Sequence, residues 1–187
     1  HGTNIMDKHV NVPEYRSKVG MVFQNFNLFP HYSVLRNVMD APVAVQKRDK
    51  EEVRKVAMEL LEKMGLADKA DAYPCQLSGG QCQRLAIARA LLRTESAIYI
   101  FDEAASNIDM ESEALIMEVI HELAKTKTVL LISHRLANVV NSDQIYFMKD
   151  GKITEKGKHE ELMQKKGAYR QLYDSQMALE NYGKESA

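Results

Sequence analysis

A chain of 187 residues is long enough for one domain, or for one domain with a small subdomain. Its net charge of −1 gives no electrostatic reason to expect nucleic acid or an anionic membrane surface as a partner. Its longest apolar runs, such as Thr128–Ile132, are far too short to span a membrane, and no signal peptide is visible. The opening His1-Gly2-Thr3 is typical of a segment cut from a longer protein.

The first predicted strand is Lys18–Phe23, an apolar run of strand length. Gln24 follows it and opens an irregular stretch, Asn25–His31, in which a proline marks a turn. Ser33 is expected to cap a short helix that runs through Met39.

Asp49–Met64 is the clearest predicted helix. Asp49 is expected to be its N-cap, Glu52 stands at the three-residue offset of a capping-box variant, and Gly65 is a natural C′ residue. Six apolar residues recur at helical spacing on one face: Val53, Val56, Ala57, Leu60, Leu61 and Met64.

Ser78 is predicted to begin the next helix, because its hydroxyl can cap the backbone and Gln81 stands where a capping box needs it. A short apolar strand is expected at Ala97–Phe101. Asp109 is expected to cap a third long helix over about residues 110–125.

The last third of the chain predicts a strand, a hairpin and two helices. Asp150-Gly151 is the strongest short signal for a hairpin turn. The expected elements are a buried strand at Thr128–Ser133, hairpin strands at Gln144–Lys149 and Lys152–Glu155, and helices at Glu160–Gln164 and Ala168–Asn181.

Strands that alternate with helices predict an α/β fold with a parallel sheet. Residues 32–93 show only helical patterns, so we expect a helical subdomain inserted into a core of residues 1–31 and 94–187 within a single domain. Cys75 and Cys82 lack metal-ligand spacing, and both are expected to be unpaired thiols.

Asp102-Glu103 follows a predicted strand and fits a magnesium–nucleotide site. A carboxylate at the carboxyl end of a strand can hold Mg²⁺, directly or through water. A second carboxylate beside it can orient and polarise an attacking water. Because two acids at a solvated strand end are common in α/β proteins, this assignment depends on the glycine-rich motif that precedes them.

That motif is Leu77-Ser78-Gly79-Gly80-Gln81. It presents backbone N–H groups and a hydroxyl at a helix N-terminus, which is an anion site by geometry and by dipole, and glycines let the backbone approach a phosphate closely. A plain capped turn would explain a lone Ser-Gly-Gly, but the full run to Leu91 is far more specific. The candidate nucleotide-binding residues here are Ser78, Gly79, Gly80 and Gln81.

Two further residues stand where they could meet a bound nucleotide. His134 follows the predicted strand at residues 128–133, and an imidazole there could contact a γ-phosphate, although a lone histidine is more often structural or simply exposed. Gln24 could reach Mg²⁺ and the attacking water, but alone it would carry no meaning.

From about Val10 to Gly183 the chain resembles an ATPase of the ATP-binding cassette (ABC) transporter family with its first segment removed. The resemblance implies a P-loop NTPase-like (RecA-like) parallel sheet that lacks its N-terminal phosphate-loop strand, with an inserted helical subdomain. The motifs stand in the family's order: Gln24 as the Q-loop, Leu77–Gln81 as the signature motif, Ile98–Asp102 as Walker B, Glu103 as the catalytic glutamate, Ser106–Asp109 as the D-loop and His134 as the switch histidine.

The resemblance implies ATP and Mg²⁺ as cofactors, with Asp102 and Gln24 near the metal and Asp109 among the nucleotide-binding residues. It implies that Glu103 and His134 are catalytic. It also implies a head-to-tail dimer that sandwiches two ATP molecules, transmembrane permease domains as partners, and a place on the cytoplasmic face of the cell membrane. No nucleic-acid partner is expected.

The 187 residues contain no G-x-x-x-x-G-K-S/T phosphate loop. In family members this Walker A loop and the aromatic residue that stacks on adenine precede the position of His1. Such enzymes act mainly by stabilising the transferred phosphoryl group electrostatically, so we expect this chain alone to have negligible ATPase activity. We also expect the strand at residues 128–133 to be left with an unpaired edge. Ala105 replaces the family's usual threonine.

The chain resembles two subfamilies in succession. Residues 19–76 are similar to the ATPases of polar amino acid importers, and residues 81–183 to exporter-type cassettes fused to a membrane domain. A recombined gene, a chimeric assembly and an intermediate lineage are all compatible with this change. Import and export both stay open. Amino-acid uptake is favoured because the membrane partner is expected to dock near residues 25–32 and the helical block, which lie in the importer-like part of the chain.

Three functional classes are compatible with these motifs. The first is the ATPase cassette of a transporter. The second is a binding module that lends only its signature face to a complete partner cassette. The third is an ABC ATPase of DNA repair or translation, which is disfavoured because the sequence shows neither long coiled-coil insertions nor tandem cassettes.

Overall fold

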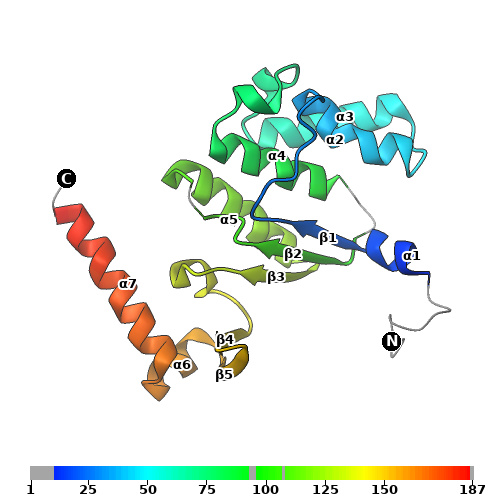
Figure 1. Cartoon of the computed structure of the whole chain (residues 1–187). Coiled ribbons are helices and arrows are strands. Elements are labelled where there is room, and N and C mark those ends of the chain that lie inside the picture. Colours follow the sequence, from blue (N-terminus) through cyan, green and yellow to red (C-terminus); the bar gives the residue numbers. More distant parts are fainter. Residues whose placement is uncertain (1–10, 93–95, 107, 186–187) are drawn as a thin grey trace. The chain divides into compact units, whose positions relative to one another are not determined.

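The computed structural model of the chain describes residues 11–92, 96–106 and 108–185 (Figure 1). The chain folds into two compact units, which divide after Ile132. The first contains a parallel sheet and the second an antiparallel hairpin. The expected division of a single domain into a core of residues 1–31 and 94–187 and a helical block of residues 32–93 stays a prediction.

Three parallel strands form the sheet of the first unit, in the order β1-β2-β3. They are β1 (Val19–Val22), which follows helix α1 (Val12–Ser17), β2 (Ile98–Asp102) and β3 (Thr128–Ile132). Val22 lies opposite Phe101, and Phe101 lies opposite Leu131, so the carboxyl ends of the three strands are aligned. The predicted parallel sheet is confirmed.

The two faces of this sheet differ in burial. Helices α4 (Gly79–Leu91) and α5 (Met110–Ala124) cover the face that carries Val22 and Phe101, which are at most 2% exposed (Figure 1). On the other face Leu130 is 50% and Ile132 is 45% exposed. The expectation of a buried strand at residues 128–133 is therefore wrong for this face. A wholly apolar strand is typical of a sheet that is buried on both faces. In the first unit, however, the described residues bury one face of the sheet.

Helices and short turns fill the chain between β1 and β2. They are α2 (Val34–Ala44), α3 (Lys50–Lys63), 3-10 turns at Ala67–Lys69 and Pro74–Gln76, and α4. Helix α2 continues past its predicted end at Met39 and runs through Pro42. Pro42 is buried on the same face as Val38, so the packing of this face offsets the hydrogen bond that a proline removes.

The predicted helix starts are confirmed at four positions. Ser33, Asp49, Ser78 and Asp109 each accept a hydrogen bond from the backbone N–H three residues on. In α3 the Glu52 carboxylate pairs with Arg48 at 3.1 Å, and Gly65 after the helix has the left-handed φ of +61° expected of a C′ residue. The predicted apolar face of α3 is buried at Val53, Ala57, Leu61 and Met64.

One hydrophobic core joins this helical stretch to the covered face of the sheet. Helices α2, α3, α4 and α5 and strand β2 all supply fully buried side chains to it, among them Val34, Leu61, Leu85, Phe101 and Ile116. Each such side chain contributes about 1.5–3 kcal/mol of transfer free energy. The core therefore fixes α4 and α5 against the sheet and holds the strand ends in place.

The second unit is a hairpin followed by two helices. It contains a 3-10 turn at Leu136–Val139, β4 (Ile145–Lys149), β5 (Lys152–Gly157), α6 (His159–Lys165) and α7 (Ala168–Glu185). Asp150 and Gly151 have φ values of +51° and +73°, as a type I′ turn requires, so the predicted hairpin is confirmed. None of the described helices is both long and apolar enough to cross a membrane.

The outer edge of β3 leads us to expect that copies of the chain associate with one another. Among the described residues, β3 pairs only with β2, and its five residues carry no charge that would oppose another strand. We expect the 187-residue polypeptide to form concentration-dependent oligomers in sedimentation velocity experiments. Leu130→Lys, which places a charge at an exposed position of this edge, should shift the protein towards monomer.

The control for this experiment is Val45→Lys. Val45 is 76% exposed, caps the end of α2 and belongs to no strand, so its replacement should leave the association unchanged. An unmodified chain that sediments as a monomer over the whole micromolar range would contradict the expectation.

Candidate functional site

Gln24 and Glu103 meet at the carboxyl end of the sheet. Because β1 and β2 are adjacent and parallel, the residues that follow them leave the sheet at the same edge. The Nε2 atom of Gln24 donates a hydrogen bond to Oε2 of Glu103 at 2.8 Å, across 79 positions of sequence. Two of the predicted site residues are therefore in direct contact.

The backbone of Glu103 is held in an uncommon conformation. Its φ is +50°, in the left-handed region that residues other than glycine rarely adopt. Its N–H donates to the carbonyl of Ile132 at 3.0 Å, and its carbonyl accepts from the N–H and the hydroxyl of Ser106 at 3.1 and 2.8 Å. Such strain costs roughly 1–3 kcal/mol and persists where neighbouring contacts determine the conformation. Here β3 and the following turn supply those contacts.

The same edge of the sheet offers donors that suit magnesium. Asp102, the half-buried last residue of β2, stands beside Glu103, and Gln24 adds an amide. Carboxylate and amide oxygens are ligands that Mg²⁺ accepts. In the part of the chain that the structure describes, no group of three His, Cys, Asp or Glu side chains is arranged to hold a metal. A Mg²⁺ ion here would take its remaining ligands from phosphate and water.

The signature motif forms the N-terminus of α4. Ser78 Oγ accepts a hydrogen bond from the Gln81 N–H at 3.3 Å, and Gln81 Oε1 accepts one from the Ser78 N–H at 2.9 Å. This reciprocal pair confirms the predicted capping box. The first turn of α4 is thereby closed, with the positive end of the helix dipole at the motif.

The two glycines of the motif have different surroundings. A Cβ atom on Gly79 would meet nothing within 4 Å. A Cβ atom on Gly80 would lie 2.6 Å from Ser112 Oγ and 2.7 Å from Asp109 Oδ2. Gly80 therefore allows α4 to pack against the N-terminus of α5. Two more predicted site residues, Gly80 and Asp109, are thus neighbours.

Asp109 is held in its ionised form. Its carboxylate caps α5, and the hydrogen bond from the Ser112 backbone N–H, reinforced by the Ser112 hydroxyl, holds the pKa of Asp109 below its usual range. The dipole of α5 also favours a negative charge at this position. The carboxylate next to Gly80 therefore carries a negative charge at neutral pH.

His134 belongs to the second unit, where its ring is exposed. Its carbonyl accepts a hydrogen bond from Gln176 Nε2 at 2.7 Å, and Gln176 Oε1 accepts one from the Leu136 N–H at 2.9 Å. Helix α7 thus fixes the backbone around His134. The role of the imidazole towards a γ-phosphate stays a prediction.

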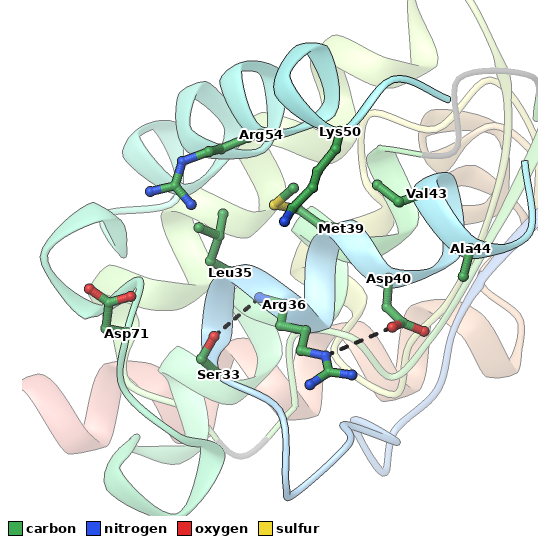
Figure 2. A pocket seen from close by; sticks show the side chains of 10 residues that line it. All are labelled: Ser33, Leu35, Arg36, Met39, Asp40, Val43, Ala44, Lys50, Arg54 and Asp71. Atoms are coloured by element: carbon green, nitrogen blue, oxygen red, sulfur yellow. Dashed lines mark hydrogen bonds and ion pairs between the residues drawn. The ribbon is translucent and has the colours of Figure 1, made fainter. Parts of the chain in front are cut away.

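Two cavities lined by described residues of the first unit bear on the site. The larger, about 590 Å³, adjoins the Gln24–Glu103 contact, and it is lined by Gln24, Asn25, Phe26, Asn27, Leu28, Pro74, Cys82 and Ser106. The other, about 420 Å³, lies between α2 and α3 and contains none of the predicted site residues (Figure 2). Its lining includes the apolar Leu35, Met39 and Val43 and the charged Arg36, Asp40, Lys50, Arg54 and Asp71.

The two cysteines are unpaired, as predicted, with Cys75 exposed and Cys82 buried. Sequence reasoning missed two residues that organise the site, Ser112 and Arg89. Ser112 stands three positions after an N-cap, a signal that could have revealed it. Arg89 bonds to carbonyls more than 60 positions away, and no local pattern marks such a contact.

The sequence profile of the ABC transporter family matches residues 2–106, more than half of the chain. The chain belongs to the ABC transporter family. The arginine transport ATP-binding protein ArgV of Corynebacterium glutamicum is 48% identical over 151 residues, which cover 79% of this chain and 59% of ArgV. The L-cystine import ATP-binding protein TcyC of Bacillus subtilis is 45% identical over 157 residues, which cover 83% of this chain and 63% of TcyC. The chain spans about three fifths of the length of these relatives.

Solved ABC structures share the fold. A bacterial Atm1-family ABC exporter with ATP bound has a TM-score of 0.77 at 26% identity, over 90% of this chain and 30% of the exporter chain. A dimeric ATP-binding cassette in a post-hydrolysis state, bound to ADP and Pi, has a TM-score of 0.71 at 34% identity, over 81% of this chain and 68% of that cassette. The expected P-loop NTPase-like fold is confirmed. Importers and an exporter are both represented among the similar ABC proteins.

The packing at Gly80 predicts a difference between the two signature glycines. Gly80→Ala should lower the free energy of unfolding by about 1–3 kcal/mol, because the added methyl group overlaps Ser112 and Asp109. Gly79→Ala, on the same helical turn and in open space, should change it by less than about 1 kcal/mol. Urea unfolding followed by circular dichroism measures both variants, and equal effects would contradict this account of Gly80.

Proposed function

We propose that the chain is the main part of an ATP-binding and ATP-hydrolysing cassette that drives the uptake of polar amino acids through a membrane permease. The observation that carries this proposal is the hydrogen bond between Gln24 and Glu103, which joins the amide and the carboxylate at the ends of two parallel strands. In a member of the ABC transporter family, this contact supports a site where Mg²⁺, water and the γ-phosphate would come together.

The residues at the strand ends would divide the chemistry among them. Asp102 and Gln24 would hold Mg²⁺, which when bound offsets the negative charge of the phosphates. Glu103 would accept a proton from the attacking water, and Gln24 would orient the Glu103 carboxylate through their hydrogen bond. His134 would contact the γ-phosphate.

The signature end of α4 would act on a second subunit. In a head-to-tail dimer, Ser78 and Gly79 would face the ATP held by the partner, where the open space around Gly79 leaves room for a phosphate. Gln81 would contribute its side chain, while Gly80 and Asp109 would keep α4 and α5 together behind it. A solved relative is a dimeric cassette with ADP and Pi bound, which supports this arrangement.

The relatives support amino-acid import. ArgV is named as an arginine transport protein and TcyC as an L-cystine import protein. The permease would dock near residues 25–32 and the helical block, where both apolar and charged side chains line the cavity between α2 and α3 (Figure 2). The chain would then lie on the cytoplasmic face of the cell membrane.

Export is the second candidate function. The exporter structure matches 90% of this chain, and residues 81–183 resemble exporter-type cassettes. Reconstitution of the whole protein with its permease in vesicles distinguishes the two directions. ATP-dependent movement of arginine or cystine towards the ATP-containing side supports import, and movement away from it supports export.

Glu103→Gln tests the hydrolytic assignment. The 187-residue polypeptide, which contains no phosphate-loop lysine motif, should release phosphate from Mg-ATP no faster than its Glu103→Gln variant. In a longer form that contains the phosphate loop, the same substitution should lower the rate by about 10²–10⁴-fold, the usual contribution of a general base. A 187-residue polypeptide clearly faster than its variant would contradict the first expectation, and a longer form unaffected by the substitution would contradict the second.

A binding module that lends only its signature face is the remaining alternative. It predicts that the 187-residue polypeptide pairs with a complete cassette only when ATP is present. Pull-down with and without ATP measures this, with Ser78→Arg as a variant that blocks the signature face. Pairing that does not depend on ATP, or that survives Ser78→Arg, would exclude the module.

A further inference from the structure

Residues 23–33 connect β1 to α2 without regular secondary structure. The backbone groups of such a segment must find partners outside a helix or a sheet. Gln24 stands near the start of this segment, and its amide meets Glu103. Whatever fixes the path of the segment therefore decides whether Gln24 reaches the carboxylate.

Arg89 supplies two of those partners. Its Nη1 donates to the carbonyl of Asn27 at 2.6 Å and its Nη2 to the carbonyl of Phe26 at 3.0 Å, while the guanidinium lies over the Phe29 ring at 6.0 Å. A planar guanidinium presents its donors in a fixed fork that can hold two adjacent acceptors, whereas the donors of an ammonium group lack that fixed geometry. Asn27 has a φ of +48°, in the left-handed region that asparagine adopts more readily than most residues, and the bond from Arg89 to its carbonyl helps to hold it there.

The downstream end of the segment has a separate anchor. The Asn37 side chain, which is 1% exposed, accepts a hydrogen bond from the Phe29 N–H at 2.8 Å. It donates to the carbonyls of Phe29, Tyr32 and Ser33 at 3.0–3.1 Å. Asn37 thus fixes residues 29–33 and does not reach the part of the segment that carries Gln24.

Gln24 gains little support from packing. Its side chain is exposed and borders the cavity of about 590 Å³. The chain is fixed before it by β1, which ends at Val22, and after it by the carbonyls that Arg89 holds. We propose that Arg89 is a positioning residue for Gln24, which sets the course of residues 24–27 so that the Gln24 amide reaches Glu103. The proposal rests on the proposed function only for the catalytic meaning of that contact.

The position of Arg89 in α4 links the Gln24–Glu103 contact to the signature motif. Arg89 lies in the last turn of α4, and the signature motif forms the first turn of the same helix. Hydrogen bonds between successive turns join the two ends of this capped helix of 13 residues. A displacement of the signature end therefore carries Arg89, the segment at residues 26–27 and Gln24 with it. Arg89 would in this way relay the position of the signature motif to the Gln24–Glu103 pair.

The test is spectroscopic and uses no nucleotide, so it can fail independently of the ATPase assignment. The probe is the ¹⁵N side-chain amide resonance of Gln24 in the 187-residue chain. Glu103→Gln should shift this resonance, because it replaces a charged acceptor by a neutral one. In the Arg89→Lys background, which keeps the charge but not the two-pronged contact, we expect this shift to be lost.

Arg84→Lys is the matched control. Arg84 also lies on α4 and donates to a backbone carbonyl, that of Met64 at 2.7 Å, on the side of α3. The response of Gln24 to Glu103→Gln should persist in this background. A response that persists equally in folded Arg89→Lys, even with a lowered Tm, would show a merely structural role for Arg89 and overturn the proposal.

The Arg89→Lys variant could fail to fold, which the amide signals of β2 and α3 would reveal. A second measurement, on chains that keep Arg89, covers that case. In low concentrations of urea, the guanidinium signals of Arg89 and the shift difference of Gln24 between the chain and its Glu103→Gln variant should disappear together. A shift difference that outlasts the ordered Arg89 signals would overturn the proposal.

Discussion

The parallel pairing of β1 with β2 is the constraint on which the candidate site depends. Val22 lies opposite Phe101, so the two chains leave the sheet side by side and Gln24 can reach Glu103. An antiparallel pairing would send these residues to opposite ends of the sheet. The core beneath this pair, made by α4 and α5, keeps the register because a slip by one residue would turn Phe101 out of it.

Polar contacts, rather than glycines, shape the backbone where the site is built. Asn27 and Glu103 both have positive φ values, and in each case side-chain or backbone hydrogen bonds from a distant segment hold the conformation. The glycine of the signature motif that matters for packing, Gly80, has a different reason for its identity. It leaves room for the N-terminus of α5, so the motif combines an open helix N-terminus at Gly79 with a close packing contact at Gly80.

Local patterns predicted the parts of the fold that depend on local physics. The N-caps at Ser33, Asp49 and Asp109 could be recognised because a cap and the backbone N–H that donates to it lie within one turn. The contact between Gln24 and Glu103 could be anticipated in outline, since residues after parallel strands share an edge. Arg89 could not, because its partners are far away in sequence and its helix position looks like an ordinary polar site.

Two differences from expectation have the same origin. The exposed face at Leu130 and the continuation of α2 through Pro42 are decided by what packs on a surface, which a single element does not reveal. The apolar sequence of a strand indicates that burial is favourable, but not which elements will bury it. A proline in a helical pattern indicates that one backbone hydrogen bond is lost, but not whether packing will offset that loss. In both cases the neighbouring elements determine the outcome.

The separation of 79 positions between Gln24 and Glu103 has a consequence for synthesis on the ribosome. Among the described residues, β1 pairs with β2, and this pairing must wait until the helical stretch and β2 have been made. Helices α2 and α3 make contacts of short sequence separation, which form early, whereas strand pairing across a long loop forms late. The contact between Gln24 and Glu103 therefore cannot form until a whole helical block and β2 have been synthesised.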